Sequence, residues 1–161
     1  MTSNLYNERL IQKTLSLNFN EITKDLDKIL LNKIKFLYEN KCSESGFIKK
    51  DSIELIKRTN GYISQYYDLA NIQFNIIFKC LICNPAPELI VDCKIIEIIK
   101  PGLIVESFPL SIIVPIQLHT NKKVFSLLNI GDNVSIKIID SKFKKFEKEI
   151  QAVGVLADEK D

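Results

Sequence analysis

The sequence predicts an α+β fold in which a mixed helix-and-sheet domain is followed by a five-stranded β-barrel of the OB type. Three observations lead to this prediction. Between Glu88 and Ala157, five short segments are rich in β-branched residues and are bounded by Gly, Pro, Asn or Asp. Glu21–Asn40 has the apolar spacing of a helix, and Asn71–Cys83 has the alternation of a strand. We therefore expect an N-terminal domain at 1–86 and a C-terminal OB-type domain at 87–161.

The N-terminal domain begins with a predicted strand at Leu10–Asn18. Asn18 and Glu21 then have the spacing of a capping box, which predicts that the helix begins near Glu21. Apolar residues recur at three- and four-residue steps along this helix: Ile22, Leu26, Ile29, Leu30, Ile34 and Leu37. We expect this face to cover a sheet, rather than to bind a membrane surface or a free partner helix.

Two short strands and one long strand are predicted after the helix. The short strands, around Gly46–Lys50 and Ser52–Arg58, follow a polar connection at Lys41–Ser45. The long strand Asn71–Cys83 alternates along its length, which predicts one buried face and one exposed face. Its apolar face comprises Ile72, Phe74, Ile76, Phe78, Cys80 and Ile82. Between these strands, a turn signal at residues 59–61 leads into a tyrosine-rich loop.

The C-terminal domain is predicted to contain one strand for each of the short β-branched segments. Turn residues at 84–87, 100–102, 108–109 and 129–132 separate them from their neighbours. OB-type barrels hold single-stranded nucleic acids or sugars on one face. The predicted strands are Leu89–Ile99, Leu103–Ser107, Leu110–Val114, Asn133–Ile139 and Glu149–Leu156.

The composition is that of a globular protein, with 46% hydrophobic and 26% charged residues. No apolar run is long enough to span a bilayer and the N-terminus lacks a signal peptide's apolar stretch, so we expect an intracellular protein without a membrane partner. The net charge is +2, with 12 basic and 9 acidic residues up to Pro87 and 10 basic and 11 acidic residues beyond it. Any RNA contact of the near-neutral barrel must therefore be local.

The cysteines and the single histidine are the candidate ligands and nucleophiles. Cys80 and Cys83 have C-x-x-C spacing and Cys93 is near, but a zinc site usually needs a second pair, and only Cys42 and His119 remain. We expect buried structural thiols, no metal site and no cofactor. His119 has no Ser, Cys or carboxylate at triad spacing, so we expect a surface histidine. No glycine-rich phosphate loop is present, and we predict no catalytic residue.

Basic residues next to aromatic rings are the candidate RNA contacts, because cations bind phosphates and rings stack on bases. One cluster, "KFKKF" at 142–146, lies in the hairpin before the last predicted strand, and a second lies in the longer connection before it. The competing interpretation is a solvated turn with two core-seeking phenylalanines. The candidate RNA-binding residues are Lys122, Lys123, Lys142, Phe143, Lys144 and Lys145.

Several segments together resemble one protein family. "FNIIFKCLICNP" at 74–85, "IVDCKI" at 90–95 and "PGLIVESFPLSIIVPIQL" at 101–118 occur in the order and spacing of the seventh-subunit family of DNA-directed RNA polymerases. "GDNVSIKIID" and "IQAVGVLADE" are similar to the final strands of that family. The connection after His119 is shorter than in the family, and this shortening is consistent with a family member from a large DNA virus.

The resemblance implies a non-catalytic subunit of the polymerase stalk. Its N-terminal domain would be a truncated-RNP-like sheet with one long helix, docked on the large subunits at the clamp base, and its OB-type domain would guide nascent single-stranded RNA. A second stalk subunit, which usually packs along the domain junction in this family, is a further candidate partner. The location would be the nucleus for a cellular protein, or the host cytoplasm and virion for a viral one. The docking tip maps onto Gly61, Tyr62, Ile63, Tyr66, Tyr67 and Leu69.

Two other classes of function remain open from the residues. An OB-type RNA-binding adaptor of an RNA-decay or translation complex would share the predicted barrel. A zinc or thiol enzyme would use the cysteines. Co-purification with large polymerase subunits separates the stalk subunit from the adaptor, and stoichiometric zinc would favour the enzyme.

Overall fold

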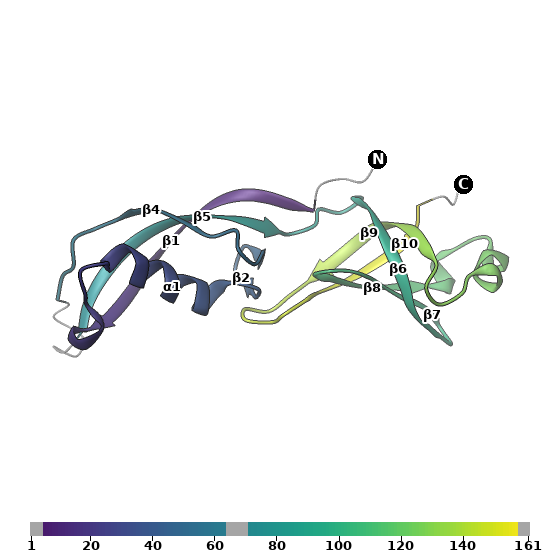
Figure 1. The fold of residues 1–161 in the computed structure, drawn as a ribbon. Helices are drawn as coiled ribbons and strands as arrows, with labels where there is room; N and C mark the ends of the chain where they lie inside the picture. The colour runs from purple at the N-terminus through teal and green to yellow at the C-terminus, as the bar shows by residue number, and fades with distance from the viewer. Residues whose placement is uncertain (1–4, 64–70, 158–161) are drawn as a thin grey trace. The chain divides into compact units, whose positions relative to one another are not determined.

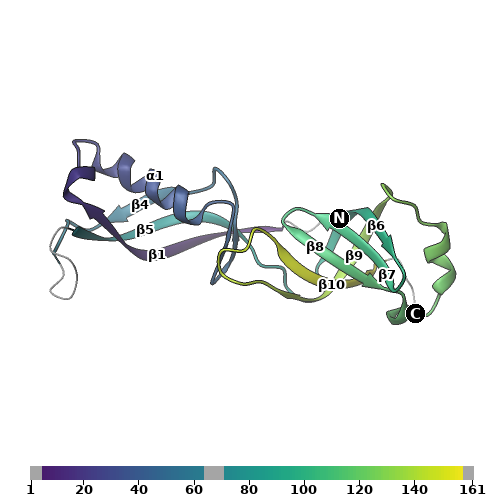
Figure 2. The same ribbon diagram turned by 90° about the horizontal axis from the view of Figure 1, so that it is seen from below.

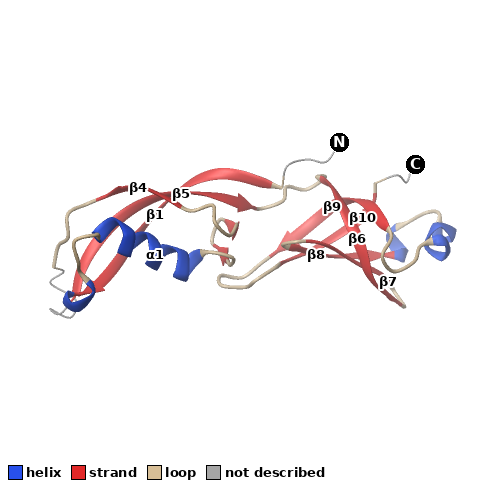
Figure 3. Ribbon diagram, viewed as in Figure 1, coloured by secondary structure: helices blue, strands red, loops and turns tan. Residues whose placement is uncertain are grey.

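A computed structural model describes residues 5–63 and 71–157 of the chain (Figure 1). The chain divides into two compact units. The sheet unit comprises Tyr6–Asn40 and Ile48–Ile82, and the barrel unit comprises Lys41–Phe47 together with the chain from Cys83 onward. The fold is α+β, with one long helix and a closed five-stranded barrel, which confirms the predicted class (Figure 3).

The N-terminal sheet has the strand order β1-β5-β3-β2, and β4 also pairs with β5. The alternating segment forms β5 with the predicted bounds, and its partner β4 runs antiparallel to it. The two-residue strand β2 lies in the segment predicted to be only a polar connection, so that prediction was wrong. Its pairing with β3 across a tight turn is a tertiary feature without a periodic signal. The strands are β1 Tyr6–Asn18, β2 Cys42–Ser43, β3 Gly46–Ile48, β4 Glu54–Arg58 and β5 Asn71–Cys83.

The helix begins later than the capping-box pattern predicts. Asn18 donates through its side-chain amide to the Glu21 carboxylate at 3.3 Å, and a 3₁₀ turn, η1 at Phe19–Glu21, occupies this position. Because the two side chains bond each other rather than backbone N–H groups, they do not cap a helix. The helix α1 spans Leu26–Tyr38, and Asp27 provides negative charge in its first turn.

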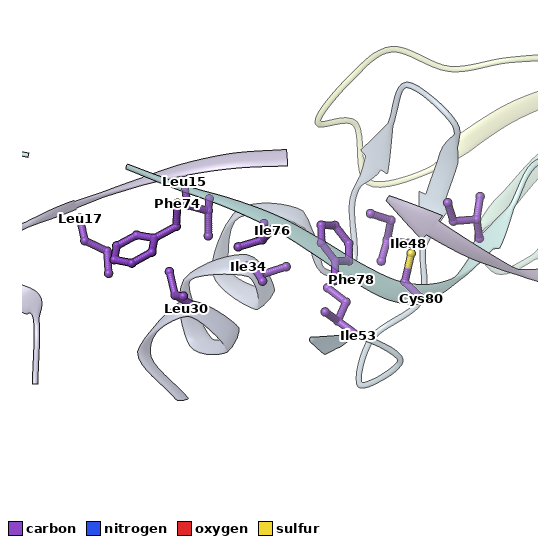
Figure 4. Packing of buried hydrophobic residues seen from close by; sticks show 11 residues of the cluster. Leu15, Leu17, Leu30, Ile34, Ile48, Ile53, Phe74, Ile76, Phe78 and Cys80 are labelled. Atoms are coloured by element: carbon purple, nitrogen blue, oxygen red, sulfur yellow. The ribbon is translucent and has the colours of Figure 1, made fainter. Parts of the chain in front are cut away.

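The apolar face of α1 packs on the sheet, as predicted. Leu30 and Ile34 are fully buried, and Figure 4 shows them pointing from the helix toward Phe74 and Ile76 of β5. Tyr38 stacks on Phe78, with ring centroids 5.8 Å apart. The buried cluster comprises Leu15, Leu17, Leu30, Ile34, Ile48, Ile53, Phe74, Ile76, Phe78, Cys80 and Ile82.

The barrel closes in the order β10-β8-β7-β6-β9, with β9 pairing back to β10 (Figure 2). Strands β8 and β10 are parallel and the other pairs are antiparallel. This connectivity, with the first three strands forming a meander and the last strand parallel to the third, is consistent with an OB-type barrel. The strands are β6 Ile90–Ile99, β7 Gly102–Ser107, β8 Leu110–Pro115, β9 Asn133–Lys142 and β10 Ile150–Leu156.

Two further segments complete the barrel unit. Between β8 and β9, the chain forms the short 3₁₀ helices η2, Ile116–Leu118, and η3, Lys122–Leu127. The β2–β3 hairpin, Cys42–Phe47, packs on the connection between β9 and β10. Cys42 N–H donates to the Glu147 carbonyl at 2.7 Å, and Phe146 N–H donates to the Cys42 carbonyl at 2.8 Å. Within the described residues, no helix has the length and apolar character needed to cross a membrane.

Candidate functional site

A cavity of about 740 Å³ lies on the barrel, between the η3 segment and strands β6 and β9. Both the connection carrying η3 and the strands β6 and β9 supply polar and apolar side chains to it, and the end of β10 adds one apolar residue. The lining residues are Asp92, His119, Thr120, Asn121, Val124, Leu128, Asn133, Val134, Ser135 and Leu156. Its volume falls within the range of small-ligand pockets, roughly 300–1,000 Å³.

Asp92 and Ser135 form the hydrogen-bonded pair of this cavity. The two residues face each other across β6 and β9, and the Ser135 hydroxyl donates to Asp92 Oδ1 at 2.8 Å. Asp92 follows Val91 and precedes Cys93, both buried in the barrel, so strand alternation places the carboxylate on the outer face.

His119 lines the same cavity but does not form a catalytic triad with this pair. Leu156 N–H donates to Nε2 at 3.0 Å, and Nδ1 lies 2.8 Å from the Pro115 carbonyl. Because Nε2 accepts, the ring is a neutral imidazole that donates from Nδ1. Its nitrogens hold backbone groups, and the Ser135 hydroxyl is directed to Asp92. The arrangement therefore offers no activated nucleophile.

The predicted surface position of His119 was wrong. The side chain is 4% exposed, and its ring packs edge-on against Phe125 with centroids 4.7 Å apart. The ring satisfies backbone groups at the ends of β8 and β10, which a buried connection requires. No sequence pattern pointed to this role, because the two backbone partners are set by the closure of the barrel.

The two predicted groups of RNA-contacting residues lie at opposite ends of the barrel (Figure 1). Lys122 and Lys123 are exposed at the start of η3, where Asn121 accepts a hydrogen bond from Lys123 N–H at 3.3 Å. The other group, at 142–146, begins at Lys142, the last residue of β9. Since a strand rises roughly 3.3 Å per residue, β9, which lies between the two groups in the chain, is itself roughly 30 Å long.

The group at 142–146 packs beside the β2–β3 hairpin. Lys145 pairs with Glu44 of the hairpin at 3.6 Å, and its ammonium lies 5.4 Å from the centroid of the Phe146 ring. Lys142 and Lys144 are exposed, whereas Phe143 is partly buried. The exposed side chains of this group are therefore accessible to a ligand, while Lys145 also pairs with the hairpin.

Half of the predicted docking tip lies within the described residues. Tyr62 pairs with Gln73 through two backbone hydrogen bonds of 3.0 and 2.8 Å, and Tyr62 and Ile63 are 41% and 52% exposed. A Cβ atom on Gly61 would lie 2.5 Å from Ile72 Cγ2, so close packing requires glycine here. The remaining predicted tip residues, Tyr66, Tyr67 and Leu69, lie outside the described residues.

The cysteines are buried free thiols, as predicted. Burial raises the pKa of Cys42 and Cys80 to about 11, with the nearby Glu147 carboxylate adding to the shift at Cys42. Burial raises the pKa of Cys83 and Cys93 to about 12. Such thiols stay protonated at neutral pH and are poor nucleophiles and ligands. Within residues 5–63 and 71–157, no cluster of three or more His, Cys, Asp or Glu residues could hold a metal ion.

No family model matches the chain. A protein of Acanthamoeba polyphaga mimivirus, named "Putative DNA-directed RNA polymerase subunit", is 24% identical to it over 167 aligned residues. The alignment covers 96% of this chain and 83% of the mimivirus protein, so the similarity extends through both units.

Proposed function

We propose that this chain is a subunit of a multisubunit DNA-directed RNA polymerase. The observation that carries this proposal is the similarity to the mimivirus protein, because it covers 96% of the chain rather than one common module. The closed barrel supports it independently, since OB-type barrels commonly bind single-stranded nucleic acids. An adaptor of RNA decay or translation could contain the same barrel, but nothing in the mimivirus similarity favours one.

Within the polymerase, the role we propose is that of the larger stalk subunit, the seventh-subunit family. Such a subunit contributes attachment and RNA guidance and no reaction centre of its own. The support is the series of segments between Phe74 and Leu118 that resembles this family in order and spacing. The large-subunit partners and a second stalk subunit follow from the same resemblance.

The proposed docking tip is the segment from Gly61 to Ala70. Tyr62 is held at the end of the sheet by backbone pairing to Gln73 of β5, and the Tyr62 and Ile63 side chains are exposed. Exposed tyrosines and aliphatic residues are the usual anchors of protein interfaces, because they bury a large area at a small entropy cost. Tyr66, Tyr67 and Leu69 would extend this apolar surface.

RNA guidance would depend on local cations rather than on overall charge. Net charge is only +2, so the field of the whole chain contributes little steering. The exposed Lys142 and Lys144 side chains and the Lys122–Lys123 pair would contact phosphates without reading bases. Phe143 and Lys145 would assist from the same connection as Lys142.

Affinity purification from the source cells or virions tests the proposed function. The tagged full-length chain is expected to recover the large polymerase subunits in stoichiometric amounts, identified by mass spectrometry. Changing Tyr66→Ala and Tyr67→Ala together should lower this recovery about tenfold, because hot-spot anchors carry most of an interface's binding energy. Phe36→Ala is the matched control, since it removes an aromatic ring that is 78% exposed on α1.

Two results would contradict the proposal at different levels. Recovery of ribosomal or RNA-decay proteins in place of polymerase subunits would support the adaptor. Normal recovery of the polymerase by the double-tyrosine variant would leave the subunit assignment in place and remove the proposed tip.

A further inference from the structure

The cavity beside η3 is lined by apolar and polar side chains, one of which is charged. Val124, Leu128, Val134 and Leu156 are the apolar lining residues. Asp92 contributes the charge, and no lysine or arginine lines the cavity in the described part of the chain. An anionic group inside would have no counter-ion and would face a carboxylate, so the cavity disfavours an anionic occupant such as a phosphate.

Cations are placed next to the cavity rather than in it. Lys122 and Lys123 are exposed and stand in the chain between two lining residues, Asn121 and Val124. Positive charge outside a cavity that contains no cation is the distribution that suits a nucleotide of RNA. Its base would enter the cavity, while the flanking phosphates stay in solvent near the two ammonium groups.

The hydrogen-bonding groups define the occupant further. The Ser135 hydroxyl donates a hydrogen bond to Asp92 Oδ1 at 2.8 Å, and the other lone pairs of the carboxylate can accept further hydrogen bonds. Because an ionised carboxylate only accepts, it is satisfied by N–H donors, and exocyclic amino groups of adenine, cytosine and guanine are such donors. Uracil has no amino group and offers a single ring N–H.

We propose that this cavity binds one unpaired nucleobase of single-stranded RNA, with a preference for amino-bearing bases, while Lys122 and Lys123 contact the adjoining phosphates. The site rests on the proposed function only for the source of its RNA. It lies on β6, β9 and the η3 connection, and is therefore distinct from the face of the second and third strands, β7 and β8, where OB-type barrels usually bind their ligands.

Fluorescence anisotropy with the full-length chain tests this site. The probes are fluorescein-labelled eight-nucleotide RNAs of adenosine, cytidine or uridine only. The adenosine and cytidine probes should bind about fivefold more tightly than the uridine probe, and Asp92→Asn should abolish that difference by removing the charge-assisted acceptor. Leu128→Trp, which fills the apolar side, should weaken binding of the adenosine probe about tenfold.

The lysine pair is tested by the salt dependence of binding. The slope of log affinity against log salt is negative. Changing Lys122→Ala and Lys123→Ala together should reduce its magnitude by about 1.4, the value for two phosphate contacts to a single strand. Lys28→Ala with Lys57→Ala is the matched control, because it removes the same charge from the sheet unit and should leave the slope unchanged.

The outcomes separate this inference from the proposed function. Unchanged RNA affinity in both Asp92→Asn and Leu128→Trp would overturn the nucleobase site, even for a chain that co-purifies with polymerase. Loss of polymerase recovery by these variants with unchanged RNA affinity would also overturn the nucleobase site, because it would show that the cavity binds a peptide of the polymerase. RNA binding that depends on the cavity in a chain that does not recover polymerase would support the site and refute the proposed function. The two variants alter different elements, β6 and the end of the η3 connection, so misfolding of one, detected by circular dichroism, leaves the other as the test.

Discussion

His119 joins three parts of the barrel unit through a single ring. It contacts the Pro115 carbonyl at the end of β8, the Leu156 amide at the end of β10 and the Phe125 ring in η3. Both nitrogen atoms and one edge of the ring are thus used. Such a bonded ring fixes the connection that forms one wall of the cavity, and so preorganises the proposed base-binding site.

The buried thiols give stability a defined dependence on alkaline pH. Burial raises the pKa of Cys93 from 9.0 to about 12, with a further contribution from Asp92. Above pH 9 the unfolded chain loses this proton while the folded chain keeps it. The contribution is therefore complete below pH 9 and is lost as the pH rises toward 12.

We predict that the free energy of unfolding, measured by urea denaturation, falls as the pH rises from about 9 toward about 12 and falls less in a Cys93→Ala variant. Lys79 acts in the same direction, because Glu54 and Glu8 raise its pKa. The variant isolates the thiol, since Lys79 is present in both proteins. Equal pH slopes for the two proteins would show that Cys93 ionises alike in the folded and unfolded chains.

At the scale of elements, the β2–β3 hairpin is the main addition to a simple barrel. It is anchored by the two backbone bonds between Cys42 and the β9–β10 connection, and by Phe47, whose ring packs edge-on against Phe108 at 5.3 Å. The Glu44–Lys145 pair is exposed and contributes little, about 0–1 kcal/mol. Apolar burial of Phe47 therefore provides most of the stability of this contact.

We predict that Phe47→Ala lowers the free energy of unfolding by about 3–5 kcal/mol, because it removes a ring that is 0% exposed. Phe36→Ala makes the same chemical change at a position that is 78% exposed and should change it by no more than about 0.5 kcal/mol. Urea denaturation of both variants checks the difference. Similar losses in the two variants would argue against a stabilising role for the hairpin.

Elements with a periodic pattern could be predicted from the sequence, and elements defined by tertiary partners could not. The alternation of β5 predicted its bounds, and the turn residues predicted each barrel strand to within a few residues. The start of α1, the strand β2 and the burial of His119 were missed. Each depends on which groups meet in space: the Asn18–Glu21 side-chain bond, the hairpin pairing and the ends of β8 and β10.

The same limit applies to the cavity. Lys122 and Lys123 were found because charge is visible in the sequence. Asp92 and Ser135 were not predicted as a site, because they are 43 residues apart and are joined only by the register of β6 and β9. Strand alternation between the buried Val91 and Cys93 places Asp92 on the outer face, but no spacing rule links it to the η3 connection.

At the scale of the whole molecule, the units are interleaved along the chain. The barrel unit takes Lys41–Phe47 from within the segment that otherwise builds the sheet unit. A boundary placed at Pro87 therefore separates the barrel strands from a hairpin that packs on them. The proposed docking role therefore belongs to the sheet unit, and the proposed RNA guidance belongs to the barrel unit together with its hairpin.

We predict that a fragment of residues 83–161 unfolds at a lower urea concentration than the barrel of the full chain, because it lacks the Cys42 and Phe47 contacts. A second fragment, with residues 41–47 joined ahead of Cys83 by a flexible linker, should recover part of the difference. Amide exchange of Ile138 and Ala152, both buried in the barrel, follows the unfolding of this unit alone. Identical midpoints for the two fragments would contradict the prediction.

The hairpin contact also has a consequence for synthesis of the chain. The Cys42 thiol contacts the Glu149 carbonyl at 3.7 Å across a sequence separation of 107 residues. Cys42 leaves the ribosome long before its partner has been translated, and at roughly 5–20 residues per second the interval is several seconds. During that time the nascent hairpin lacks the β9–β10 connection on which it packs, and the Phe47 ring stays exposed until the last barrel strand emerges.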